Sequence, residues 1–160
     1  MNVALVFLIV TALLFGLAYL TKRRFGVLGL ALAAGAMLSD LWAQALTPVI
    51  EQTGVMVERP PLATLVAIAL VLLPAVILLS SGPSYRDMTM RIAGAACFAA
   101  LAIALLVEPL GSALVLTGES KVVYDFFVQN RVYIVTAGLV IALVDVLATH
   151  TGHRIGRGKH

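Results

Sequence analysis

Four polar side chains recur at helical spacing in a stretch of sequence that is otherwise apolar. Asp40, Gln44, Thr47 and Glu51 follow one another at steps of three or four residues, so a helix would carry them on one side. A carboxylate within hydrocarbon is costly unless it is protonated, paired or hydrated. The stripe therefore indicates a proton or cation pathway, with a hydrogen-bonded contact between helices as the alternative.

Asp145 is the second carboxylate inside an apolar segment, about one helical turn from the predicted cytoplasmic surface. Arg24 and Arg154 have long side chains that could reach it along the membrane surface. We expect a structural ion pair between Asp145 and one of these arginines. The three histidines are scattered over a glycine-rich tail, which lacks the fixed geometry of a metal site, so no metal is expected.

Signatures of known catalytic and cofactor sites are missing from the sequence. The chain has no phosphate-binding loop, dinucleotide fingerprint, paired-cysteine motif or zinc-protease motif. Ser39 lies next to Asp40, but neighbours on a helix diverge by about 100°. The sequence therefore predicts no cofactor and no enzymatic activity, and a membrane enzyme that acts on a lipid is the least favoured alternative.

The composition indicates which solvent surrounds most of the chain. Hydrophobic residues make up 61% of the 160 residues and charged residues 12%, whereas soluble domains have roughly 45–50% and about 25%. A soluble fold of this size could not hide so much apolar surface, so a lipid bilayer must surround much of it. The apolar runs are far longer than barrel strands. The expected fold is an all-α, polytopic transmembrane helical bundle.

The apolar runs predict five transmembrane helices in one domain, residues 1–150. They cover residues 3–20, 27–50, 62–79, 92–107 and 132–149. Before the last run, Lys121, Asp125 and Gln129 repeat every four residues opposite apolar side chains, which predicts a short amphipathic helix in the membrane interface. A lid formed by residues 112–130 is the alternative.

The positive charges predict how the chain is oriented in its membrane. The net charge is +3, and Lys22, Arg23 and Arg24 form a basic elbow after the first run. With the N-terminus outside, this elbow, the loop after the third run and the C-terminal tail all face the cytoplasm, as the positive-inside rule requires. We therefore expect residues 151–160 to be a flexible, basic cytoplasmic tail, and the elbow to bind anionic lipid headgroups rather than nucleic acid.

Small residues mark the helix faces that are expected to pack closely. Four alanines of the fourth run lie at steps of three or four residues, and the second run has a similar stripe. Such spacing lets helix backbones approach one another. The expected packing positions are Gly29, Ala33, Ala36, Ala93, Ala96, Ala100 and Ala104.

Two short motifs lie in the first two-thirds of the chain, roughly residues 1–107. A leading helix ends in the basic elbow Lys22-Arg23-Arg24-Phe25-Gly26, and a later helix opens with Arg91-Ile92-Ala93-Gly94. This layout resembles the colicin V production protein family of bacterial inner-membrane proteins. The resemblance implies a multi-pass protein of the bacterial inner membrane without established catalysis, and it carries over no functional residues.

The sequence supports two functional hypotheses from different classes. The first is a non-enzymatic membrane protein that acts through oligomerisation or partner binding, because small-residue faces are present and catalytic motifs are not. The second is a small oligomeric channel, or a proton- or cation-coupled transporter, that uses the polar stripe from Asp40 to Glu51.

Overall fold

The computed structural model describes residues 3–53, 61–80, 84–85, 87–113 and 119–155 of the chain. These residues form five α-helices and no β-strand. The helices are α1 (Val3–Thr21), α2 (Phe25–Glu51), α3 (Leu62–Ser80), α4 (Met88–Ala113) and α5 (Glu119–Ile155). The all-helical prediction is therefore confirmed.

Four of these helices are long and apolar enough to cross a membrane. The candidate spans are Phe25–Glu51, Leu62–Leu79, Met88–Gly111 and Tyr124–Ala148. In α1, the apolar stretch among the described side chains is the shorter Leu8–Thr21. A membrane helical bundle with four candidate crossings follows, and a fifth crossing by α1 stays a prediction.

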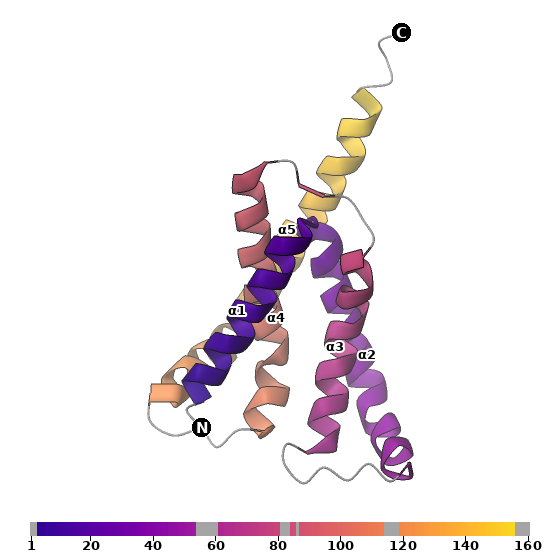
Figure 1. Cartoon of the computed structure of the whole chain (residues 1–160), viewed down its shortest axis with the longest axis vertical. Helices are drawn as coiled ribbons and strands as arrows, with labels where there is room; N and C mark the ends of the chain where they lie inside the picture. The colour runs from indigo at the N-terminus through magenta and orange to yellow at the C-terminus, as the bar shows by residue number, and fades with distance from the viewer. Residues whose placement is uncertain (1–2, 54–60, 81–83, 86, 114–118, 156–160) are drawn as a thin grey trace.

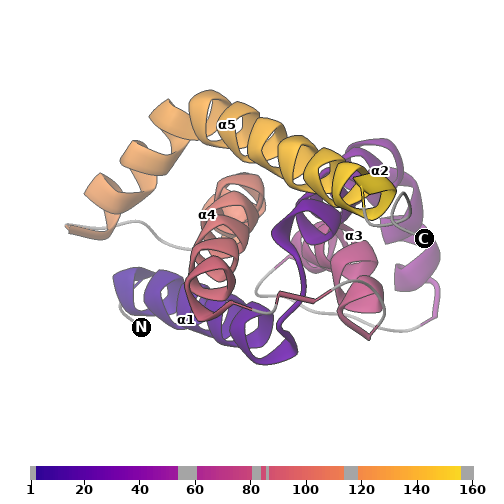
Figure 2. The ribbon, with the colours of Figure 1, turned by 90° about the horizontal axis from the view of Figure 1, so that it is seen from above.

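Helix α4 occupies the centre of the bundle. It contacts each of the other four helices, and Figure 2 shows it between α1 and α5, with α2 and α3 beside it. Every residue from Leu101 to Val107 is buried, whereas a helix at the edge of a bundle buries only one face. The core is therefore built around the second half of α4, and Phe25 and Leu32 of α2 pack into the same cluster.

Helices α2 and α3 lie side by side along most of their length (Figure 1). A side chain at Gly35 would meet the carbonyl oxygens of Leu70 and Val71 on α3, so the absence of a Cβ permits this close approach. Away from the α1–α2 connection, the α2–α3 pair diverges from the other three helices (Figure 1).

Helix α5 differs from its prediction. The prediction of a separate short amphipathic helix is wrong, because this segment and the last apolar run form one helix, Glu119–Ile155. This helix is about 55 Å long. Between Glu119 and Ala137 there is no glycine or proline to interrupt it. Tyr124 and Phe127 pack on the buried Ile103 and Val107 of α4, so the first turns of α5 belong to the bundle.

The C-terminal ends of α4 and α5 also lie beyond the predicted ones. Helix α4 continues through Pro109 to Ala113 rather than ending at residue 107. Helix α5 continues to Ile155, so it includes the first part of the expected tail. Residues 156–160 of that tail lie outside the described residues.

Candidate functional site

The α1–α2 connection is held against two other parts of the chain by hydrogen bonds. Lys22 has a positive φ of 56°, and its carbonyl oxygen accepts a hydrogen bond from the Tyr85 N–H at 2.8 Å. Arg23 donates from Nε to the Leu79 carbonyl oxygen at 3.1 Å and forms an isolated β-bridge with Ser84. The turn is therefore fixed to the end of α3 and to the connection that leads to α4.

Two side chains from distant parts of the sequence cap the N-terminus of α2. The first N–H groups of a helix have no acceptor within that helix. Here the Phe25 N–H donates to the Tyr85 hydroxyl at 3.1 Å, and the Gly26 N–H donates to Oδ2 of Asp145 at 2.9 Å. The Tyr85 hydroxyl donates to the same carboxylate oxygen at 3.3 Å. A negative charge at this end also interacts favourably with the helix dipole.

Arg24 completes this group, which we call the polar junction (Arg24, Gly26, Tyr85 and Asp145). Nη2 of Arg24 lies 3.8 Å from Oδ1 of Asp145, and the guanidinium carbon lies 5.3 Å from the centre of the Tyr85 ring. The two charged side chains are 27% and 18% exposed, so water screens them only partly. The structure thus brings together two of the three residues expected to form an ion pair. The side chain of the third, Arg154, lies outside the described residues.

The hydroxyl of Tyr85 stays protonated within the polar junction. Burial raises the pKa of Tyr85 above its ordinary value of 10.0, and the negative charge of Asp145 raises it further. The hydrogen bond from the Phe25 N–H, the second-largest effect after burial, and the charge of Arg24 lower the pKa, but the net shift is upward. A neutral hydroxyl can accept from one group and donate to another, so Tyr85 links the start of α2 to α5.

The polar junction requires close approach of α2 and α5. A Cβ on Gly26 would lie 2.6 Å from the Ala142 carbonyl oxygen and 2.9 Å from Oδ2 of Asp145, distances that side chains do not tolerate. One turn further along α2, a Cβ on Gly29 would lie 3.0 Å from the Ala142 Cβ. Gly29 therefore lies at a helix contact, between α2 and α5.

A second cation is fixed at the same end of the bundle. Arg91 donates from Nε to the Tyr19 carbonyl oxygen at 2.6 Å, and its guanidinium carbon lies 3.8 Å from the centre of the Tyr19 ring. In the sequence, Arg91 is marked only as the first residue of an apolar helix. A long-range contact with a particular tyrosine leaves no local pattern in the sequence.

The predicted polar stripe of α2 lies on the outside of the described chain. Asp40, Gln44 and Glu51 are exposed, and Thr47 is half-buried with its hydroxyl donating to the Ala43 carbonyl oxygen at 2.6 Å. Among the described residues, no hydrogen bond or ion pair reaches the Asp40 side chain. The four residues of the stripe therefore lie together on α2, but the other described helices do not enclose them.

The small residues expected at packing positions divide into two groups. On α2, Gly29 is buried, and Ala33 and Ala36 are half-buried. On α4, one alanine lies in the core and three others face outward. The core residue is Ala104, and the exposed residues are Ala93, Ala96 and Ala100.

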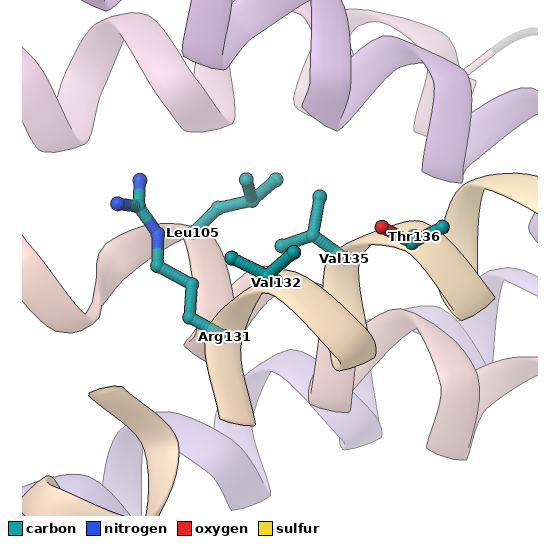
Figure 3. A pocket seen from close by; sticks show the side chains of 5 residues that line it. All are labelled: Leu105, Arg131, Val132, Val135 and Thr136. Atoms are coloured by element: carbon teal, nitrogen blue, oxygen red, sulfur yellow. The ribbon is translucent and has the colours of Figure 1, made fainter. Parts of the chain in front are cut away.

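A shallow cavity of about 240 Å³, open to the outside, lies between α4 and α5 (Figure 3). Leu105 of α4 lines it together with four residues of α5, which are Arg131, Val132, Val135 and Thr136. Arg131 also forms an ion pair with Glu108 of α4. This pair is not predicted from the sequence, in which its only signal is an isolated charge at the edge of each of two apolar runs.

The fold and these contacts define a polytopic helical membrane protein whose α1–α2 connection, α3–α4 connection and α5 meet in one polar junction. No protein family, curated protein or solved structure matches the chain. Among the described residues, no three His, Cys, Asp or Glu side chains lie close enough together to hold a metal ion.

Proposed function

We propose that this protein is a non-enzymatic, multi-pass membrane protein that acts by associating with a second copy of itself or with another membrane protein. The observation that carries the proposal is the exposed carboxylate of Asp40 within a candidate membrane span. A partner that supplies a hydrogen-bond donor or encloses water would remove the cost of leaving that carboxylate against lipid.

The position of Asp40 along α2 supports this reading. Asp40 follows Phe25 by 15 residues, which corresponds to about 22 Å of helix. The hydrocarbon core is about 30 Å thick. If α2 enters the core near Phe25, Asp40 lies beyond the midplane but still within hydrocarbon, where an ionised carboxylate costs up to about 3 kcal/mol.

The outward face of α4 also favours association. Ala93, Ala96 and Ala100 are exposed at helical spacing, although α4 is the helix that contacts all the others. Small side chains let two helices in lipid approach closely enough for extensive van der Waals contact. This alanine face can therefore receive a helix from a partner.

The alternative function is a small oligomeric channel or a proton- or cation-coupled transporter. It is favoured by one observation, the gathering of Asp40, Gln44 and Glu51 on the exposed side of a single helix. Because this side faces away from the rest of the chain, a polar path would form between copies arranged around an axis.

The proposed setting is a bacterial inner membrane with the N-terminus outside and the C-terminus in the cytoplasm. Lys22, Arg23 and Arg91 lie at the same end of the bundle as the polar junction, which the positive-inside rule would place in the cytoplasm. Lys22 is exposed and is the elbow cation best placed for anionic lipid headgroups. The bacterial inner membrane is the setting that the resemblance to the colicin V production protein family implies.

Photo-crosslinking in native membranes tests the association. A photoreactive residue at Gln44 or Ala96 should give protein adducts, either a dimer of this chain or a heavier product with another membrane protein. The matched control is Val144, which is exposed on α5 and should react mainly with lipid. Adducts with lipid alone at both test positions would contradict the proposal.

Flux measurements test the alternative. Proteoliposomes with the wild type should pass protons or cations faster than empty liposomes if the stripe forms a path, and Asp40→Asn should abolish the difference. Protein adducts at Gln44 without any flux would favour association as the function.

A further inference from the structure

The cavity between α4 and α5 combines apolar walls with a pair of opposite charges. Leu105, Val132 and Val135 provide apolar surface, and Arg131 lines the same cavity (Figure 3). Glu108 pairs with Arg131, and the two side chains are 60% and 32% exposed. The charges are therefore accessible from outside, and the pair has no net charge.

The charged pair lies far from the polar junction. Arg131 precedes Asp145 by 14 residues on α5, about 21 Å of helix. Glu108 follows Arg91 by 17 residues on α4, about 25 Å of helix. In a hydrocarbon core about 30 Å thick, a polar junction near one headgroup boundary places this pair close to the opposite boundary.

The apolar part of the cavity extends from the pair toward the middle of the membrane. Val132, Val135 and Thr136 follow Arg131 on α5, in the direction of the polar junction. Leu105 precedes Glu108 by about one turn on α4, in the same direction. Charges at headgroup depth with apolar walls toward the midplane match the two parts of a phospholipid.

We propose that this cavity binds a phospholipid whose headgroup carries a phosphate and a primary ammonium group. Arg131 binds the phosphate, because a guanidinium presents several N–H donors to phosphate oxygens. Glu108 accepts hydrogen bonds from the ammonium group, and the cavity holds part of one acyl chain. An anionic lipid would satisfy Arg131 but place a negative headgroup beside Glu108. A quaternary ammonium group has no N–H to donate to that carboxylate.

This inference needs only the membrane location of the protein and is independent of the proposed association. The test is native mass spectrometry of the full chain, purified in a mild detergent and offered phosphatidylethanolamine, phosphatidylcholine and phosphatidylglycerol with identical acyl chains. The wild type should retain phosphatidylethanolamine about tenfold more than either competitor, the factor expected of one charge-assisted hydrogen bond.

Variants assign each part of the site. Glu108→Ala, which removes the acceptor, should abolish the preference over phosphatidylcholine, and Arg131→Gln should lower retention of all three lipids. Thr136→Phe should fill the cavity and also lower retention of all three, whereas Val140→Phe, at an exposed position of α5 outside the cavity, should not. The ratio of two lipids is measured within one sample, so partial misfolding lowers both amounts and leaves the ratio unchanged.

Three results would overturn the proposal. The first is equal retention of the three lipids by the wild type, and the second is a preference for phosphatidylglycerol. The third is a preference for phosphatidylethanolamine over phosphatidylcholine that survives Glu108→Ala. None of these results would bear on the proposed association of the protein with a partner.

Discussion

Replacing Gly26 with alanine should destabilise the bundle at the contact between α2 and α5. The added Cβ would lie 2.6 Å from the Ala142 carbonyl oxygen and 2.9 Å from both Oδ2 of Asp145 and Cγ2 of Val146. Because the nearest of these atoms belongs to backbone, a rotamer change cannot relieve the contact. The part of α5 that contains Ala142 and Asp145 must therefore move away from α2. This movement lengthens the 2.9 Å hydrogen bond from the Gly26 N–H to Asp145.

The expected loss in free energy of unfolding for Gly26→Ala combines two effects. Overpacking costs about 1–3 kcal/mol, and loss of a hydrogen bond to a charged acceptor costs about 1.5–3 kcal/mol. The higher helix propensity of alanine returns at most about 1 kcal/mol. We therefore expect a net destabilisation of about 2–4 kcal/mol, as these central values indicate.

Gly16→Ala provides a matched control for the same chemical change. Among the described residues, no atom outside the adjacent backbone of α1 lies within 4 Å of a Cβ built on Gly16, which is in the later half of α1. Alanine there should stabilise the protein by up to about 1 kcal/mol, because it lowers the conformational freedom of the unfolded chain. The two substitutions should therefore shift stability in opposite directions.

Unfolding in mixed detergent micelles, followed by circular dichroism, measures both effects. The titration should be reversible so that the free energy of unfolding can be extrapolated. A Gly26→Ala variant as stable as the wild type would refute the close approach of α2 and α5 at the polar junction. Equal shifts for the two glycines would show that helix propensity alone governs both positions.

Two further predictions concern the polar junction. Asp145→Asn keeps an acceptor for the Gly26 N–H but loses the charge beside the N-terminus of α2, so it should lower the free energy of unfolding by about 1 kcal/mol. Asp145→Ala leaves that N–H without its acceptor and should lower it by about 2–3 kcal/mol. Equal costs for the two variants in the same unfolding assay would contradict the capping role. The raised pKa of Tyr85 means that the unfolded chain loses this proton first, so the stabilisation by Tyr85 is fully present below the ordinary pKa of 10.0 and is lost as the pH rises through the higher folded-state pKa. The difference in stability between the wild type and Tyr85→Phe should therefore shrink above that ordinary value, and a constant difference would refute the shift.

The polar junction and the charged pair divide the bundle into two ends of different character. At one end, side chains and backbone from α2, the α3–α4 connection and α5 are joined by hydrogen bonds. At the other end the α2–α3 pair diverges from α1, α4 and α5 (Figure 1). The exposed Asp40 and the cavity beside Arg131 both lie away from the polar junction, whereas Lys22 and the start of the alanine face of α4 lie at the same end of the bundle as the junction.

The amino-acid sequence by itself determined the all-helical class and the approximate position of each apolar helix. These are local properties, because hydrocarbon favours any sufficiently long apolar run and the backbone satisfies its hydrogen bonds within that run. The sequence also limited the partners of Asp145 to two arginines. Arg24 could be named because charge and predicted side of the membrane restrict the choice.

Only the tertiary structure decided which distant groups meet. Tyr85 and Asp145 cap α2 across separations of 60 and 119 residues, and the tight fit at Gly26 depends on the carbonyl of a residue on another helix. The pairing of Glu108 with Arg131 was likewise decided by how α4 and α5 pack together. Spacing along one helix specifies which side chains share a face, but the neighbour of that face depends on how all five helices pack together.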